Sequence, residues 1–420
     1  MTENLTENVR KDPYASLRFS EFRSYVSMRF LLTFAYQIQA VVIGWHIYQL
    51  TKDPLSLGLI GLAEAIPAIS VSLYGGYIAD KSDKKKMLVW VIAAMTFCSF
   101  ILLLVTMPQT LFPVSKAFVI PVIYGMILLI GVARGFFSPA AFAIMAQIVP
   151  KEHYPNSSTW NSSSWQIASI VGPAVGGLLY SFSGISSCFV VIMVFMLASL
   201  ASLIFFIKNQ PPQFIPKENI YKSLQEGIRF VFNSKMVLGA LSLDMFSVFF
   251  GGAVALLPIF ANDILKVGAE GLGLMRAAPA AGAVLTMFVM ARYSPMGKPW
   301  RNLLIAVTGF GLSIIAFGLS RNFYLSLLIL FFEGSFDSVS VIIRSTILQL
   351  LTPDEMRGRV AAVNSMFIGS SNEIGAFESG ATAKLMGTIT SVLFGGSMTL
   401  MVVGFTWLKT KRLVPLSLKE

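Results

Sequence analysis

The chain has 420 residues, of which 55% are hydrophobic and only 13% are charged, and its mean hydropathy is +0.71. A soluble domain carries charge on about a quarter of its residues, so a soluble globular protein is excluded. Two cysteines and two histidines are too few for a disulfide framework or a zinc enzyme, and we expect no metal and no other cofactor.

Twelve stretches are long and apolar enough to cross a membrane, which takes about 20 mostly apolar residues. The predicted spans are 27–50, 56–79, 87–107, 117–148, 157–182, 185–207, 237–261, 270–291, 302–320, 324–350, 359–386 and 389–408. The first 26 residues hold no apolar core followed by a small-residue cleavage site, so we expect no cleaved signal peptide.

The basic residues predict the orientation of these spans. Most of the 32 lysines and arginines fall in segments on the same side as the N-terminus, and the opposite segments hold only Lys52, Lys116, Lys266 and Arg321. Because lysine and arginine collect in cytoplasmic loops, both termini are expected in the cytoplasm of a cell whose plasma (inner) membrane holds the protein. The net charge of +11 is therefore a topology signal, and no nucleic-acid partner is expected.

A polar segment divides the spans six and six, and it opens with Asn209-Gln210-Pro211-Pro212, which cannot continue a helix. We therefore predict an N-terminal six-helix bundle over 1–207, a cytoplasmic linker over 208–236 and a C-terminal six-helix bundle over 237–420. Apolar residues recur at near-helical spacing within the linker, at Ile220, Leu224, Ile228, Val231 and Phe232. This pattern predicts an amphipathic helix on the inner membrane face, and a simply solvated linker is the alternative.

The two bundles are predicted to be parallel repeats of one another. A shift of 203 positions superposes Gly131 on Gly334, Asn161 on Asn364, Gly172 on Gly375 and Gly177 on Gly380. The matches fall at corresponding places in each six-span block, as in transporters built from parallel repeats. The expected fold is thus an all-α integral membrane protein with twelve transmembrane helices in two related bundles.

Charged side chains within spans are costly in hydrocarbon, so they normally face the protein interior and indicate a pathway. The third, sixth, ninth and twelfth predicted spans carry none, which predicts a central cavity lined by the other eight. The candidates for proton coupling or ion pairing are Glu64, Arg134, Asp244, Arg276, Glu333, Asp337, Arg344, Glu373 and Glu378.

The tenth span carries three of these candidates on one helical face. Glu333 and Asp337 are four residues apart, and Arg344 lies seven residues beyond Asp337, too far for a direct bond within one helix. We expect Arg344 to pair with another span and one of the two carboxylates to carry a proton, with Arg134 a candidate partner for Asp337. A buried ion-pair network that only fixes helix packing is the alternative.

Glu64 and Arg276 stand at matching points of the second and eighth spans, each three residues before a proline. They are predicted to pair across the two halves, either as an outer gate or as static packing.

Two motifs connect the chain to a known superfamily. The segment Gly76-Tyr77-Ile78-Ala79-Asp80-Lys81-Ser82-Asp83-Lys84-Lys85 resembles the signature loop of the major facilitator superfamily, G-x-L-A-D-R-x-G-R-K, with Ile78, Lys81 and Asp83 as departures. The segment Gly172-Pro173-Ala174-Val175-Gly176-Gly177 looks like the core of the antiporter motif of its exporters. The resemblance implies a gating loop at Gly76, Asp80, Lys81, Lys84 and Lys85, and a rocking interface at Gly172, Pro173, Gly176 and Gly177.

The segments Leu351–Val360 and Leu224–Val231 are similar to those of the enterobactin-exporter-like group of drug:proton antiporters. This resemblance implies a transporter and not an enzyme: it works by alternating access, acts as a monomer in the lipid bilayer, and exports a small siderophore-like or drug-like compound against protons. Proton symport or import, or a lysophospholipid-type flippase, are alternatives. A membrane receptor would need a sensor domain, and the sequence shows no sign of one.

Overall fold

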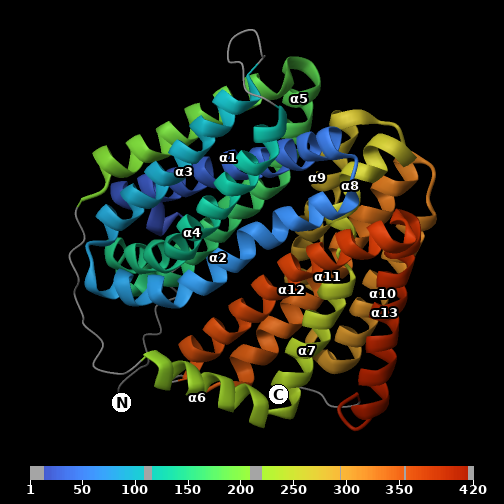
Figure 1. The fold of residues 1–420 in the computed structure, drawn as a ribbon. Helices are drawn as coiled ribbons and strands as arrows, with labels where there is room; N and C mark the ends of the chain where they lie inside the picture. The colour runs from blue at the N-terminus through green and yellow to red at the C-terminus, as the bar shows by residue number, and fades with distance from the viewer. Residues whose placement is uncertain (1–13, 108–115, 209–219, 294, 354–355, 415–420) are drawn as a thin grey trace, which may run out of the picture.

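The computed structural model describes residues 14–107, 116–208, 220–293, 295–353 and 356–414, and these are helices joined by short connections, with no strand among them (Figure 1). The first half of the chain contains α1 (Ser20–Thr51), α2 (Pro54–Lys81), α3 (Lys84–Thr106), α4 (Lys116–Ile148) and α5 (Tyr154–Phe206), with short 3-10 turns at Ala15–Arg18 and Lys151–His153. Helix α5 covers both the fifth and sixth predicted spans. At Gly184, with φ of 73°, its backbone leaves the helical region, a conformation that glycine adopts without steric cost.

The second half contains α7 (Lys235–Phe250), α8 (Ala253–Ile259), a π-turn (Phe260–Ile264), α9 (Gly268–Arg292), a 3-10 turn (Pro295–Gly297), α10 (Pro299–Leu319), α11 (Phe323–Leu351), α12 (Arg357–Met386) and α13 (Thr388–Lys409). The seventh predicted span is broken between α7 and α8, where Gly251 and Gly252 interrupt the helix. Gly387, with φ of 91°, separates α12 from α13.

Ten helical stretches in the described part of the chain are long and apolar enough to cross a membrane. One of them, Asn156–Phe206, has 51 residues and contains the break at Gly184. Helix α12 is not among the ten, because its 30 residues include several polar and charged side chains. The carboxylates that make α12 a weak hydropathy signal are therefore also what makes it a candidate for function.

The linker helix predicted from its apolar spacing forms as α6 (Ile220–Asn233), and it lies beside the ends of α7 and α12 (Figure 1). Val231 is buried against the second half, whereas Phe232 remains exposed. Glu226 forms an ion pair with Arg359 of α12, and a Cβ at Gly227 would lie 3.0 Å from the Arg359 carbonyl oxygen. The two segments that resemble the enterobactin-exporter-like group thus touch each other at this junction.

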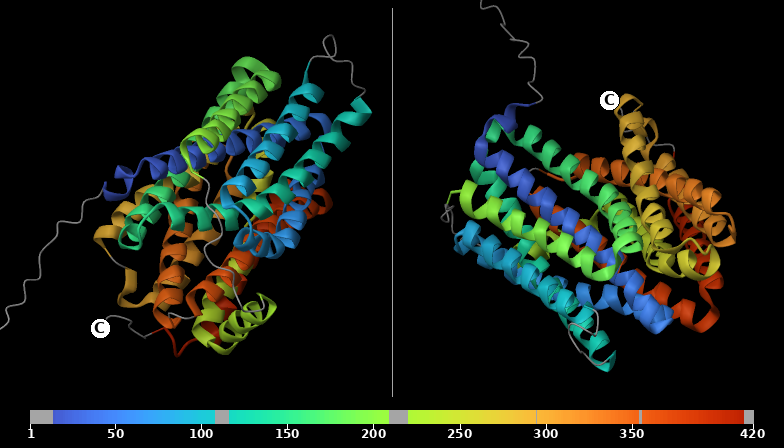
Figure 2. Two further views of the ribbon diagram at one scale, coloured as in Figure 1. Left: turned by 90° about the vertical axis from the view of Figure 1, so that its left-hand side faces the viewer. Right: turned by 90° about the horizontal axis from the view of Figure 1, so that it is seen from above.

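The two halves form separate bundles that meet at one end of the molecule (Figures 1 and 2). We call this the closed end, and define it as the end where α1 finishes at Thr51 and α2 begins at Pro54. Helix α5 packs against α9, and α2 packs against α12. One apolar cluster crosses between the halves here, and it includes Val41 and Trp45 of α1 with Leu257 and Phe260 of the second half.

Polar contacts join the halves at the same end. Gln49 donates from Nε2 to Oδ1 of Asn262 at 2.7 Å, and the neighbouring Tyr48 hydroxyl donates to Asp263. Lys384, at the end of α12, forms an ion pair with Asp53 at 2.7 Å. The closed end is therefore sealed by an apolar cluster with a rim of polar bonds.

Candidate functional site

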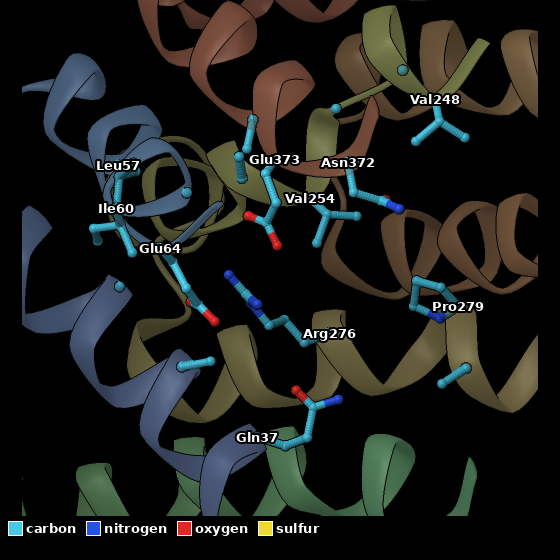
Figure 3. Close-up of a pocket in the computed structure, with 18 of the residues that line it drawn as sticks. Gln37, Leu57, Ile60, Glu64, Val248, Val254, Arg276, Pro279, Asn372 and Glu373 are labelled. Atoms are coloured by element: carbon cyan, nitrogen blue, oxygen red, sulfur yellow. The ribbon is translucent and has the colours of Figure 1, made fainter. Parts of the chain in front are cut away.

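A cavity of about 480 Å³ lies between the two halves (Figure 3). Its polar lining is made by Tyr36, Gln37, Gln39, Glu64, Arg276, Glu333, Asp337, Asn372 and Glu373. The prediction that the third, sixth, ninth and twelfth spans avoid the cavity while the other eight line it is only partly right. Phe310 of α10, in the ninth predicted span, does line the cavity, and none of the lining residues comes from α5.

The Glu64 carboxylate is held within its own half. Its Oε1 accepts a hydrogen bond from the Tyr36 hydroxyl at 2.6 Å and forms an ion pair with Arg134 of α4. Arg134 also donates to the Tyr36 oxygen at 2.8 Å, with its guanidinium 4.6 Å from the centre of the Tyr36 ring. The two pairings predicted for these residues, Glu64 with Arg276 and Arg134 with Asp337, are therefore wrong. Helices α2 and α4 pack side by side in the same bundle, which places these two charges together.

Arg276 of α9 extends into the space between the halves (Figure 3). Figure 3 shows its guanidinium directed between Glu64 of α2 and Glu373 of α12. The buried Nε atom of Arg276 has no hydrogen-bond partner. Arg276 is thus the one guanidinium among the described lining residues, and it faces carboxylates of both halves.

Glu333 and Asp337 of α11 line the second half's side of the cavity, as their shared helical face predicted. Glu333 is 8% exposed, and its buried Oε2 atom has no hydrogen-bond partner. Neither residue forms an ion pair within the part of the chain that the structure describes. These two carboxylates are therefore available to bind a proton or a ligand.

Arg344, from the same helix, pairs with Asp244 of α7, and this confirms that it bonds to another span. The two residues are 4% and 6% exposed, and neither lines the cavity. Glu378 of α12 is also absent from the lining. Arg134, bonded to Glu64, is not a lining residue either, so four of the nine sequence candidates are absent from the cavity lining.

The predicted gating loop joins α2 to α3. Gly76, Asp80 and Lys81 lie in the last turns of α2, and their side-chain surroundings lie outside what the structure describes. Lys84 is buried, and Lys85 donates from Nζ to the Ile204 carbonyl oxygen at 2.8 Å. Asp83, a departure from the superfamily glycine, has an extended backbone with φ of −65°, so no left-handed glycine is needed here. Its side chain caps α3 by accepting from the backbone N–H groups of Lys85 and Lys86.

The antiporter-like glycines lie where α5 meets α1 and α9. A Cβ at Gly172 would lie 2.7 Å from the Gln37 Cβ, and a Cβ at Gly176 would lie 3.1 Å from the Ile38 Cα. Pro173 and Gly177 face the other half: a Cβ at Gly177 would lie 2.8 Å from the Gly273 Cα. Small residues let these helices approach closely.

Sequence reasoning missed several residues of the site and of the closed end. Tyr36 escaped notice because one hydroxyl in an apolar span carries no charge signal. Asn372 lies next to the candidate Glu373 and lines the cavity with it. Gln49, Asn262 and Asp263 lie at helix ends, where polar residues are ordinary.

A polar cavity between two bundles of apolar helices, sealed at one end, defines a helical membrane transporter. A model of the transmembrane secretion effector family matches residues 11–416, and the chain belongs to this family of the major facilitator superfamily.

Known proteins similar to the chain agree with this assignment. The enterobactin exporter EntS of Shigella boydii serotype 18 is 24% identical over 393 residues, which cover 91% of this chain and 90% of that protein. A POT family transporter in complex with a thioalcohol-conjugated peptide superposes with a TM-score of 0.75 at 12% identity, over 93% of this chain and 96% of that one. A D-xylose–proton symporter superposes with a TM-score of 0.73 at 13% identity, over 95% and 100%. At these identities the two structures show the shared fold alone.

Proposed function

We propose that this chain exports a small amphipathic compound in exchange for protons, by alternating access to the cavity between its two bundles. The observation that carries the proposal is the set of carboxylates lining a cavity sealed at one end. Unpaired acidic groups inside a membrane protein are expensive, and they characteristically take part in proton relays.

The proposal includes twelve membrane crossings in two parallel repeats. The break at Gly184 supports counting α5 as two crossings, and α12 supplies the remaining one. Equivalent helices also meet through glycines. Gly177 of α5 packs on Gly273 of α9, and Gly380 of α12, its repeat equivalent, would place a Cβ 2.9 Å from the Cα of Gly58 in α2. The same close crossing thus joins the halves twice, as a repeat requires.

The proposal places both termini in the cytoplasm, on the basis of the lysine and arginine bias. Helix α1 then runs outward, so the closed end faces the outside of the cell. The proposal therefore takes the observed state as inward-facing, and it requires the seal at the closed end to open when the cavity turns outward.

The proposal assigns the proton to Asp337, with Glu333 beside it as the second acidic group. Both lack an ion-pair partner within the described chain, whereas Glu64 is held by Arg134 and Asp244 by Arg344. A carboxylate already bound to an arginine resists protonation, because the opposite charge favours its ionised form. The unpaired carboxylates of α11 are therefore better placed to load and release a proton.

Export is favoured by the enterobactin exporter, a relative across nearly the whole chain, and by the antiporter-like glycines of α5. Proton-coupled import is the second candidate, and the D-xylose–proton symporter shares the fold on which it would depend. A flippase for lysophospholipids remains a third, and it would need the cavity to open sideways to the bilayer.

Purified protein in proteoliposomes provides the test. A panel that includes a catecholate siderophore and drug-like amphiphiles is added under an imposed pH gradient, and an internal fluorescent dye reports proton movement. Export predicts proton flux opposite to the flux of one of these compounds. Flux in the same direction would favour import, and lipid transfer without proton flux would favour a flippase.

Asp337→Asn tests the assigned proton carrier. We expect it to abolish gradient-driven accumulation while exchange down a concentration gradient continues. Glu270→Gln is the matched control, because Glu270 is an exposed carboxylate of α9 that does not line the cavity. Full proton-driven transport by folded Asp337→Asn protein would remove Asp337 from the mechanism.

A further inference from the structure

The described side chains that line the cavity include more acidic groups than basic ones. Glu64, Glu333, Asp337 and Glu373 contribute four carboxylates, whereas Arg276 contributes the one guanidinium. Arg134, which is not a lining residue, is already bound to Glu64. Arg276 can balance one further carboxylate, and Figure 3 shows it facing Glu373. Glu333 and Asp337 then remain as an unbalanced acidic pair on α11.

Glu333 is the anchor point of this pair. It is 8% exposed, lines the cavity, and leaves a buried oxygen without a hydrogen-bond partner. A buried polar atom without a partner in the protein calls for an explanation, and a bound ion or ligand is one. A positively charged group bound there would supply both the missing partner and the missing charge.

Beyond these charged groups and the polar Tyr36, Gln37, Gln39 and Asn372, the cavity wall is mostly apolar. Leu57 and Ile60 of α2 lie on one side in Figure 3, with Val254 of α8 on another, and Phe310 of α10 adds one aromatic ring. Ligand sites of about 300–1,000 Å³ commonly combine apolar walls with a few placed polar groups, and this cavity of about 480 Å³ falls in that range. Its chemistry fits a drug-sized molecule with an apolar body and one basic group.

We propose that the cavity selects cationic amphiphiles over neutral and anionic ones, with the Glu333 carboxylate as the direct partner of the positive charge. The inference rests on the proposed transport function and narrows its substrate class. An anionic ligand of the same size would bring negative charge into a cavity whose lining already holds more acidic groups than basic ones. Selection therefore depends on charge rather than on shape.

The test uses two probes of nearly the same size and shape but opposite charge, tetraphenylphosphonium and tetraphenylborate. Binding of each to the purified protein is measured by equilibrium dialysis at one fixed pH, without a membrane or a gradient. We expect tetraphenylphosphonium to bind at least tenfold more tightly than tetraphenylborate. Equal binding of the two, tighter binding of the anion, or no binding of either would overturn the proposal.

Glu333→Gln tests the anchor, because the amide keeps the shape of the side chain and removes its charge. We expect tetraphenylphosphonium binding to weaken at least tenfold, while Glu270→Gln leaves it unchanged. Unchanged cation binding by folded Glu333→Gln protein would overturn the role of Glu333. If that variant does not fold, the comparison of the two probes on the unmodified chain still decides the charge preference.

Because dialysis measures binding without transport, its result can fail independently of the proposed transport function. Protein that selects the cation but moves no compound against a gradient would contradict the transport proposal alone. Protein that pumps a neutral or anionic compound and shows no preference for the cation would contradict the charge preference alone.

Discussion

Arg344 and Asp244 form a buried ion pair that the proposed transport cycle does not use. Removing one partner leaves the other charge buried and uncompensated, which costs about 3–5 kcal/mol. Arg344→Met should therefore lower the thermal stability of the purified protein strongly. Asp244→Leu combined with Arg344→Met should recover most of that loss, because an apolar pair replaces the two charges. If the Arg344→Met variant has the same melting temperature as the unmodified protein, this structural role is contradicted.

The ion pair between Asp53 and Lys384 should make the stability of the closed end depend on pH. The Lys384 ammonium bonded to Asp53 holds the pKa of that carboxyl below its ordinary value. A lowered pKa in the folded state stabilises the contact above the ordinary pKa, about 3.9, and this contribution is lost as pH falls through the lowered value. The contact should thus persist from pH 5 to 8 and weaken only in stronger acid.

Lys384→Met checks this forecast while leaving Asp53 free to cap α2, where it accepts from the backbone N–H of Leu55. Both partners are partly exposed, so the pair is worth about 0.2–1 kcal/mol. The readout is the reaction of an impermeant reagent with a cysteine at Val41, which is buried in the closed end. We expect the variant to react less than tenfold faster at pH 7 and to lose the acid-dependent rise in rate. An unchanged acid response would remove the Asp53–Lys384 pair as its cause.

At the scale of helices, Gly177 sets how closely α5 approaches α9. A Cβ there would lie inside van der Waals contact with the Ala269 carbonyl oxygen and 2.8 Å from the Gly273 Cα. Because both are backbone atoms, Gly177→Ala must push the two helices apart. We expect transport to fall at least tenfold and the cysteine at Val41 to react faster.

Gly125→Ala is the control for this crossing, because a Cβ at Gly125 of α4 meets nothing within 4 Å. It should leave both readouts unchanged. Equal behaviour of the two alanine variants would mean that the α5–α9 crossing tolerates a wider spacing than the structure shows.

Hydropathy predicted most of the helices because every crossing must bury its backbone polar groups in a long apolar stretch. It could not predict the break at Gly251–Gly252, where the apolar character continues on both sides. Hydropathy also could not show which charged residues form ion pairs with each other. Glu64 bonds to Arg134, 70 residues away, because of how α2 and α4 are rotated about their own axes. Side-chain packing sets that rotation, and no periodic pattern in a single sequence reveals it.

The same reasoning explains which parts of the site were predictable. All four carboxylates of the cavity were candidates from sequence, since any charge within a span is costly and therefore conspicuous. Asp244 and Glu378 were equally conspicuous, yet they lie away from the lining. Charge indicates that a residue must be shielded, and only the fold shows whether a partner helix or the cavity provides that shielding.

At the scale of the whole molecule, the proposed alternating access requires the closed end to open once in each transport cycle. Gln49 of α1 and Asn262 of the second half touch across this seal, with 2.7 Å between Nε2 and Oδ1. Cysteines at these two positions can be joined by a short bifunctional reagent. The native Cys98 and Cys188 are both buried, so they should contribute little background.

A cross-link between the two cysteines of the double variant Gln49→Cys/Asn262→Cys should hold the molecule in the observed state. We expect transport in proteoliposomes to fall to background and to return when a reducible cross-linking reagent is cleaved. Tetraphenylphosphonium binding in detergent should persist, because neither cross-linked residue lines the cavity. Each single cysteine variant, treated in the same way, should transport normally. Undiminished transport by fully cross-linked protein would show that the closed end does not open, and alternating access across this seal would have to be abandoned.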